Sequence, residues 1–284
     1  MRIFWLKYKK TIPGGLILLL LTAFGCGTPP EKADLSEAEM PMIRQDGIEL
    51  PRFASARDQL NYAKSGFNDL KKKRAAFRAV LTLFPNDRNP CGHAAAGLAY
   101  LFLEPDYRFA DDRDIRQAIA GFSEILEAYA DQPDVAAKSH WYLGWIHTDL
   151  LRTPDKGIRH FLYIADHFTR IPMRLAVPVP WANLVSPAGG DQVLTPAIPE
   201  KYWGEIALLE VIRNADPGLA ARAFDRLFET YPSGYAAGFA LKVMLEKPES
   251  AGHALPRVDA YLSRPSINPY LANRIRHLAG RGRH

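Results

Sequence analysis

The sequence predicts an all-α domain over residues 53–280, built as a solenoid of antiparallel helix pairs with long inserted loops. From Ala54 onward, apolar residues recur at helical spacing and are interrupted by Pro, Gly or Asp. No strand-like alternation is long enough to compete with this helical period. In addition, Phe is followed by an aliphatic residue three positions later and an aromatic residue seven positions later, and this pattern occurs four times. A repeated pattern of this kind indicates a helical repeat.

Each copy of the pattern places three apolar side chains on one face of a helix, because offsets of 0, 3 and 7 return to the same side at 100° per residue. A small residue four positions before the Phe lets a neighbouring helix approach closely in three copies, whereas the first copy has Lys73 there. The copies are Phe77/Val80/Phe84, Phe122/Ile125/Tyr129, Phe161/Ile164/Phe168 and Phe224/Leu227/Tyr231, and the small residues are Ala118, Gly157 and Ala220.

Residues 1–25 have the order of a secretory signal: a basic head, an apolar core from Ile12 to Leu21, and small residues before a cysteine. The apolar run is about half of the ~20 residues that a membrane-spanning helix needs. The segment Ala23-Phe24-Gly25-Cys26 resembles the bacterial lipobox, which implies acylation of Cys26 and firm attachment to a bilayer. Gly27 follows instead of the Asp that retains enteric lipoproteins at the inner membrane. This resemblance implies the periplasmic face of the outer membrane.

The basic balance of the chain comes mostly from this signal. The net charge is +5, and the first 25 residues contain four basic and no acidic side chains. The remaining chain is nearly neutral, so the sequence gives no reason to expect a nucleic-acid partner. With Cys26 acylated, Cys91 is the one thiol left, so no internal disulfide can form and we expect a small buried or half-buried side chain at Cys91.

Two segments interrupt the helical pattern. Residues 26–52 are polar, charged and proline-bearing, which predicts a flexible tether between the lipid and the folded domain. Residues 171–200 form a Pro-rich insertion whose apolar stretch, including Trp181, argues against free disorder. We expect this insertion to dock on its own solenoid or on a partner.

The helix predicted from Val135 to Leu151 and the helix that follows it together resemble a tetratricopeptide repeat. Trp141, Gly157, Phe161 and Ile164 fall at the spacing of that family. The resemblance implies a solenoid over most of residues 54–250, with an extended surface for protein or peptide partners.

The lipobox and the C-terminal repeat together resemble a more specific family. The run from Phe224 through Leu227 and Tyr231 to Pro232-Ser233-Gly234-Tyr235-Ala236 looks like a helix that ends in Tyr-Pro-x-Ser before a new helix begins. This pattern resembles the tetratricopeptide-type lipoprotein of the outer-membrane β-barrel assembly machinery. The resemblance implies a role in outer-membrane protein assembly or envelope maintenance.

Catalytic motifs do not stand out in the sequence. It contains no Gly-x-Ser-x-Gly, phosphate-binding loop, His-Glu-x-x-His or Cys-x-x-Cys pattern, so we expect neither an enzyme nor a cofactor. The alternative is an exported, cell-wall-acting enzyme whose site forms between the 171–200 insertion and the histidines. Asp166, Asp191 or Glu200 would then have to lie in a closed cleft.

Four histidines invite a metal or small-ligand hypothesis. His140/His147 and His160/His167 are two pairs spaced seven residues apart on helices that should be neighbours. Two helical turns separate the members of a pair by ~10 Å, too far to share one zinc ion. Only a contact across the two helices would build a site. The simpler interpretation is partly exposed polar side chains beside the core.

Four aromatic residues are candidates for a partner-binding groove: Trp145, Trp181, Tyr202 and Trp203. At helical spacing such residues more often belong to the core. The sequence as a whole predicts a lipid-anchored scaffold or adaptor in the cell envelope, which binds protein or peptide partners on a helical-repeat surface and contacts the membrane through Cys26.

Overall fold

A computed structural model of the chain describes residues 41–65, 69–104, 110–173, 201–264, 267 and 269–281. The predicted signal, Cys26, Trp181 and most of the 171–200 insertion lie outside the described residues. The described chain is mostly helical, which confirms the all-α class, with one short pair of strands. None of its helices is both long and apolar enough for a bilayer crossing.

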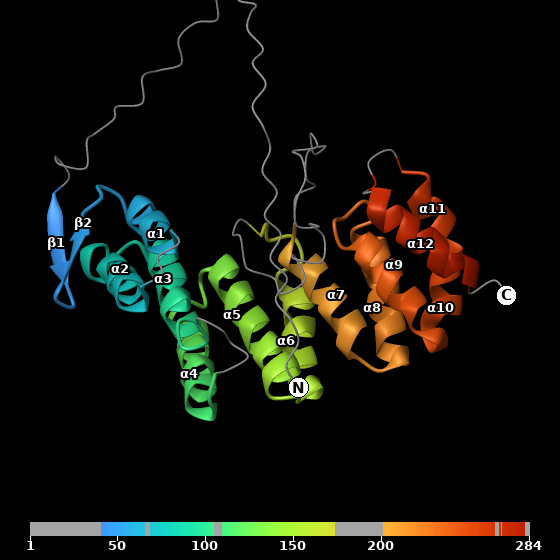
Figure 1. Ribbon diagram of the computed structural model, residues 1–284, viewed down its shortest axis with the longest axis horizontal. Helices are drawn as coiled ribbons and strands as arrows, with labels where there is room; N and C mark the ends of the chain where they lie inside the picture. The colour runs from blue at the N-terminus through green and yellow to red at the C-terminus, as the bar shows by residue number, and fades with distance from the viewer. Residues whose placement is uncertain are drawn as a thin grey trace, which may run out of the picture. The chain divides into compact units, whose positions relative to one another are not determined.

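The elements follow one another along the chain as Figure 1 shows. The strands are β1 (Met42–Gln45) and β2 (Ile48–Pro51). The helices are α1 (Ala56–Lys64), α2 (Leu70–Leu83), α3 (Arg88–Tyr100), α4 (Asp112–Ala128), α5 (Pro133–Trp145), the π-helical turn η3 (Ile146–Leu150), α6 (Pro154–His167), α7 (Trp203–Asn214), α8 (Pro217–Thr230), α9 (Ala237–Glu246), α10 (Pro248–Ala254), the 3₁₀ turn η5 (Leu255–Arg257), α11 (Val258–Leu262) and α12 (Pro269–Arg281).

The hairpin of β1 and β2 lies inside the segment that the sequence predicts as a tether. The strands pair antiparallel, with Gln45 opposite Ile48. Asp46 and Gly47 between them both have positive φ, 53° and 78°, as a two-residue hairpin turn requires. Leu50 is fully buried in a cluster with α1 and α2 side chains. The tether prediction is therefore wrong for residues 42–51, because four-residue strands are too short to show a clear alternation.

The four copies of the sequence pattern form four helices that end in the same way. In α2, α4, α6 and α8 the Phe and the aliphatic residue are buried, and the third, aromatic residue is the C-cap. In each case the amide of that C-cap donates to the carbonyl of the aliphatic residue four positions earlier. The pairs are Phe84 to Val80 (3.1 Å), Tyr129 to Ile125 (2.9 Å), Phe168 to Ile164 (2.8 Å) and Tyr231 to Leu227 (2.9 Å).

Proline and small residues shape the junctions between these helices. Five helices begin with proline, at positions 133, 154, 217, 248 and 269, where its missing N–H costs nothing and its fixed φ suits the first turn. The small residue predicted at Gly157 allows α6 to approach the π-helical turn. A Cβ there would lie 2.5 Å from Thr148 Cγ2 and 2.6 Å from the Gly144 carbonyl oxygen.

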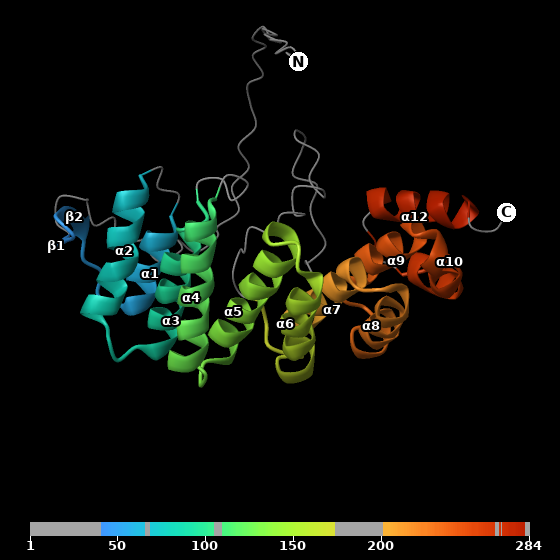
Figure 2. The same ribbon diagram turned by 90° about the horizontal axis from the view of Figure 1, so that it is seen from below.

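The helices pack in two layers. Each helix from α1 to α8 contacts the next helix along the chain, and Figure 2 shows α1 to α6 side by side. The odd-numbered helices also contact one another: α1 with α3, α3 with α5, α5 with α7, and α7 with α9. Among the described residues, α2, α4, α6 and α8 make no comparable contacts with each other. The odd-numbered helices therefore form one continuous layer, which the even-numbered helices cover on one side.

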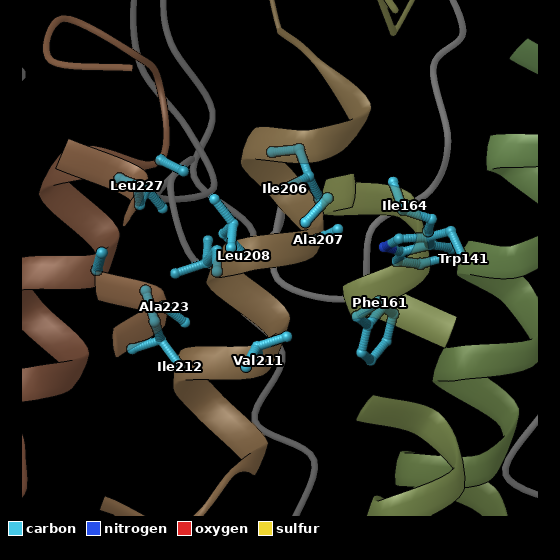
Figure 3. Packing of buried hydrophobic residues seen from close by; sticks show 14 of the residues in the cluster. Trp141, Phe161, Ile164, Ile206, Ala207, Leu208, Val211, Ile212, Ala223 and Leu227 are labelled. Atoms are coloured by element: carbon cyan, nitrogen blue, oxygen red, sulfur yellow. The ribbon is translucent and has the colours of Figure 1, made fainter. Parts of the chain in front are cut away.

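Helix α7 lies at the centre of the core. Every residue from Trp203 to Ile212 is buried. Figure 3 shows α7 between its neighbours, with Ala207 on the side of Ile164 in α6 and Ile212 on the side of Ala223 in α8. This helix is buried all round because it packs against α5, α6, α8 and α9.

Candidate functional site

Helix α5 presents a polar stripe to the layer of odd-numbered helices. Asp134, Lys138 and Tyr142 are spaced by four residues, so they lie one above another on the same face of the helix. α5 contacts α3, and α3 contacts α1. The stripe therefore meets side chains from two other odd-numbered helices, among them His93 of α3 and Lys64 of α1.

The Asp134 carboxylate is satisfied by neutral donors. Its Oδ1 accepts from Asn89 Nδ2 at 2.7 Å and from the Val135 amide at 3.0 Å. Its Oδ2 lies 2.9 Å from His93 Nε2. Burial alone would raise the pKa of Asp134, but the hydrogen bonds from His93 and Asn89 lower it below the usual range. Asp134 is therefore a carboxylate whose two oxygens are already occupied.

His93 is neutral in this arrangement. Burial is the largest effect on its pKa and lowers it; the hydrogen bond to Asp134 raises it and the charge of Lys138 lowers it, and the net pKa is below the ordinary value. A neutral imidazole that bonds a carboxylate must place its proton on Nε2. Its Nδ1 then has an unshared pair, and this buried atom has no partner among the described residues.

Two lysines beside Asp134 have only part of the counter-charge that buried amines need, because the charge of Asp134 raises the pKa of each by less than burial lowers it. Burial lowers the pKa of Lys138 to about 7, with Lys64 as a second cause, and burial lowers the pKa of Lys64 to about 8. Within the described chain neither lysine forms an ion pair, and the Lys138 Nζ faces the Tyr142 ring at 5.9 Å from its centroid. Both amines are thus held partly uncharged near neutral pH.

This group of side chains, Lys64, His93, Asp134 and Lys138, is hereafter called the lysine site. Lys138 is 8% exposed and Lys64 is half-buried, so the lysine site borders the surface of the protein. An incoming carboxylate would supply the missing counter-charge in a region where ion pairs are poorly screened. The arrangement is therefore suited to binding an anionic group.

The structure brings two of the four candidate histidines together. His140 of α5 and His160 of α6 approach with their Nδ1 atoms 2.9 Å apart. His147 lies in η3 and bonds Thr153 Oγ1 at 3.0 Å, and its ring stacks on that of His160 with centroids 6.1 Å apart. His167 ends α6 and packs against Tyr163.

The histidine contact is a pair of neutral rings. Burial, followed by the charge of neighbouring histidines, lowers the pKa of His140 and of His160 to about 4. Two neutral imidazoles can share one Nδ1 proton, one ring donating and the other accepting. In the part of the chain that the structure describes, no group of three or more His, Cys, Asp or Glu side chains is placed to hold a metal ion.

The candidate partner-binding aromatics do not form an exposed groove. Trp145 and Trp203 are 5% and 1% exposed and belong to the core, so their assignment to a binding surface is wrong. Helical spacing placed them inside, between packed helices. Tyr202 is half-buried, and its ring stacks on Tyr231 at 5.9 Å. Trp181 lies outside the described residues.

A buried carboxyl group on α7 occupies a different environment. The Glu205 side chain is fully buried, and its Oε1 accepts from the Ala236 amide at 2.5 Å, at the start of α9. Gly234 permits this approach, because a Cβ there would lie 2.1 Å from Oε1. Oε2 has no partner among the described residues. Burial raises the pKa of Glu205 to about 7.

The sequence interpretation missed Lys64, His93, Asp134, Lys138 and Glu205. A signal exists for two of them. Lys138 and Glu205 each interrupt a run that is otherwise mostly small or apolar, 135–146 and 203–212, in which the other Asp, Glu, His, Lys or Arg residues are His140 and Glu210. A charged residue within a run that must be buried indicates an unusual environment. Lys64 and His93 come from other helices, so only the fold brings them to this place.

Comparisons with known proteins assign no family to this arrangement. No protein-family model, no curated protein and no solved structure matches the chain. Function must therefore be inferred from the contacts of the lysine site and from the sequence patterns.

Proposed function

We propose that the chain is a lipid-anchored adaptor of the cell envelope that binds an acidic segment of a partner protein on its odd-numbered helices. The observation behind this proposal is the pair of desolvated lysines, Lys64 and Lys138, next to a carboxylate that neutral donors already occupy. Two desolvated amines beside one carboxylate that other donors already occupy cost the folded protein stability. A carboxylate from a partner would turn this cost into binding free energy.

We interpret the fold as a tetratricopeptide-like solenoid. The four helices with equivalent C-caps support this interpretation, as does the continuous layer of odd-numbered helices. In paired-helix repeats the first helix of each pair lines an extended binding surface. Lys64, His93 and Lys138 belong to three successive first helices, α1, α3 and α5, so one partner segment that lies across them would meet all three.

The membrane attachment in this proposal depends on Cys26. Acylation there would hold the adaptor at the periplasmic face of the outer membrane, where a role in outer-membrane protein assembly or envelope maintenance follows from the family resemblance. Replacing Cys26 by Ala should move the full chain from the membrane to the soluble fraction without lowering its melting temperature. Persistent membrane association of Cys26→Ala would contradict the anchor.

Binding to the lysine site can be tested with a defined probe. We expect an acetylated, amidated tetraglutamate peptide to bind the full chain, and the matching tetraglutamine peptide not to bind, in a calorimetric titration at low salt. Lys138→Met should weaken tetraglutamate binding about tenfold or more, as for loss of a charge-assisted contact.

The matched control is Lys156→Met on α6, which removes the same charge from an exposed position. We expect the control to change the affinity less than about twofold, because exposed charges are screened. Equal losses in the two variants would reduce the effect to net charge, and equal binding of tetraglutamine would show that carboxylates are not recognised. Either result overturns the lysine site as the partner-binding site.

A further inference from the structure

A cavity of about 440 Å³ lies in the C-terminal part of the chain, away from the lysine site in sequence. It is lined by residues at the end of α8 and just after it, in η5, in α11 and just after α11. Four of its lining residues are apolar and two are arginines: Phe228, Pro232, Pro256, Ala260, Arg257 and Arg264. A concave apolar surface with a few polar groups is the usual form of a small-ligand site.

The two arginines share one aromatic ring. The Arg257 Cζ lies 5.4 Å from the centroid of the Phe228 ring, and the Arg264 Cζ lies 6.0 Å from it. The ring supports both guanidinium groups by cation–π contact and fixes them at the wall of the cavity. Both arginines are therefore held in place before any ligand binds.

One carboxylate, Asp225, contacts an arginine of the cavity. Asp225 Oδ1 accepts from Arg257 Nη2 at 3.2 Å, and its Oδ2 lies 3.0 Å from His253 Nε2. One carboxylate is thus divided between an arginine and a histidine. Asp225 therefore offsets at most one of the two arginine charges at the wall of the cavity.

Arg264 has no acidic partner among the residues described. Its guanidinium packs against the Tyr261 ring, with 4.8 Å between Cζ and the ring centroid, and against Phe228. Burial lowers the pKa of Arg264 below its ordinary value, the direction expected when a cation is desolvated without a counter-ion. The ring contacts do not occupy all five N–H donors of the Arg264 guanidinium group.

We infer that this cavity binds a compact apolar group that bears a single carboxylate, such as a small aromatic acid or the free C-terminal residue of a peptide. The apolar group would fill the space between Phe228 and the two prolines, and the carboxylate would accept from the Arg264 fork. This inference is independent of the adaptor proposal, because it shares no residue with the lysine site.

The probe is N-acetyl-L-phenylalanine, and its neutral counterpart is N-acetyl-L-phenylalaninamide. In saturation-transfer NMR and calorimetric titrations with the full chain, the acid should bind about tenfold more tightly than the amide, because only the acid can pair with Arg264. The peptide Gly-Gly-Gly-Gly-Phe with a free carboxylate tests whether the natural ligand is a small acid or the C-terminal residue of a peptide. Binding at least as tight as that of the small acid points to a peptide end, and weaker binding points to a free acid.

Two variants at the cavity and one control test the location. Arg264→Gln should weaken binding of the acid about tenfold. Ala260→Trp fills the cavity from an exposed position, so it should abolish binding without unfolding the chain. Arg222→Gln removes a positive charge from an exposed position on the same helix as Phe228 and should have little effect. Equal binding of acid and amide, or full binding to Ala260→Trp, would overturn the inference.

Discussion

Lys138 and Glu205 are side chains of opposite charge that are buried in comparable positions, but their hydrogen-bond partners differ. Each is buried and lies on an odd-numbered helix. Burial lowers the pKa of Lys138 to about 7 and raises the pKa of Glu205 to about 7. The structure provides a partner for one of them. Glu205 accepts the Ala236 amide at the start of α9, whereas Lys138 has no acceptor in the described chain.

This difference separates a structural group from a binding group. A carboxyl group at a helix N-terminus satisfies an amide that would otherwise be unpaired, so the fold uses Glu205. A buried amine without an acceptor stabilises nothing in the fold, so its use has to come from a partner. Four comparisons of variants with the wild type test this distinction.

Removing the Glu205 carboxyl should have the largest effect. Glu205→Ala leaves the Ala236 amide unpaired and opens a cavity at a fully buried position, so we expect the free energy of unfolding to fall by about 3 kcal/mol. Urea denaturation measures this change. Glu229→Ala, at an exposed position on α8, is the control. A Glu205→Ala variant as stable as that control would mean that Glu205 is not a structural cap.

The charge of Glu205 should affect stability in a definite pH range. Its pKa is raised from 4.5 to about 7, so the stabilisation is fully present below pH 4.5 and is lost as the pH rises through 7. Compared with Glu205→Gln, the wild type should lose on the order of 2 kcal/mol between pH 4.5 and 7.5. Denaturant midpoints of both proteins across this range provide the measurement. Parallel curves would contradict the raised pKa.

Replacing Lys138 should not destabilise the fold. Lys138→Met keeps the length of the side chain and removes an uncompensated amine, so the free energy of unfolding should stay equal or rise by about 1 kcal/mol at pH 7. The pKa of Lys138 is depressed from 10.5 to about 7, so the wild type should regain stability relative to Lys138→Met as the pH rises toward 10. A loss above 1 kcal/mol would show that Lys138 is a structural group after all.

The contact between His140 of α5 and His160 of α6 is a third place where partial burial shifts pKa values. The pKa of His160 is lowered from 6.5 to about 4, so its contribution is present above pH 6.5 and is lost as the pH falls toward 4. Compared with wild type, His160→Leu should lose less stability over this range, by on the order of 1 kcal/mol, because both rings are only partly buried. His277→Leu on the surface of α12 is the control.

The sequence predicts the helices well because their period is strong. The Phe stripes and the close approach at Gly157 are local features, and each appears where the spacing puts it. The β1–β2 hairpin was missed because a four-residue strand gives almost no periodic signal, although Asp46-Gly47 is a typical hairpin turn.

The candidate site was much less accessible to prediction from sequence. Lys64, His93 and Lys138 are 74 residues apart at the extremes, and they come together only because successive odd-numbered helices contact one another. Trp145 and Trp203 were candidates because aromatic side chains suit binding surfaces. The helix period that places them also points them into the core, and the same period puts Lys138 beside Asp134.

Proton uptake on binding tests the lysine site most directly. At pH 8 an amine with a pKa of about 7 is mostly uncharged, and a carboxylate bound beside it should raise that pKa, so the full chain should take up roughly one proton when the tetraglutamate peptide binds. Titration calorimetry in two buffers with different ionisation enthalpies measures this number. We expect this uptake in wild type and in Lys156→Met, and a clearly smaller uptake in Lys138→Met, where Lys64 with its pKa of about 8 is the remaining amine. Binding at pH 8 without proton uptake would contradict this proposal.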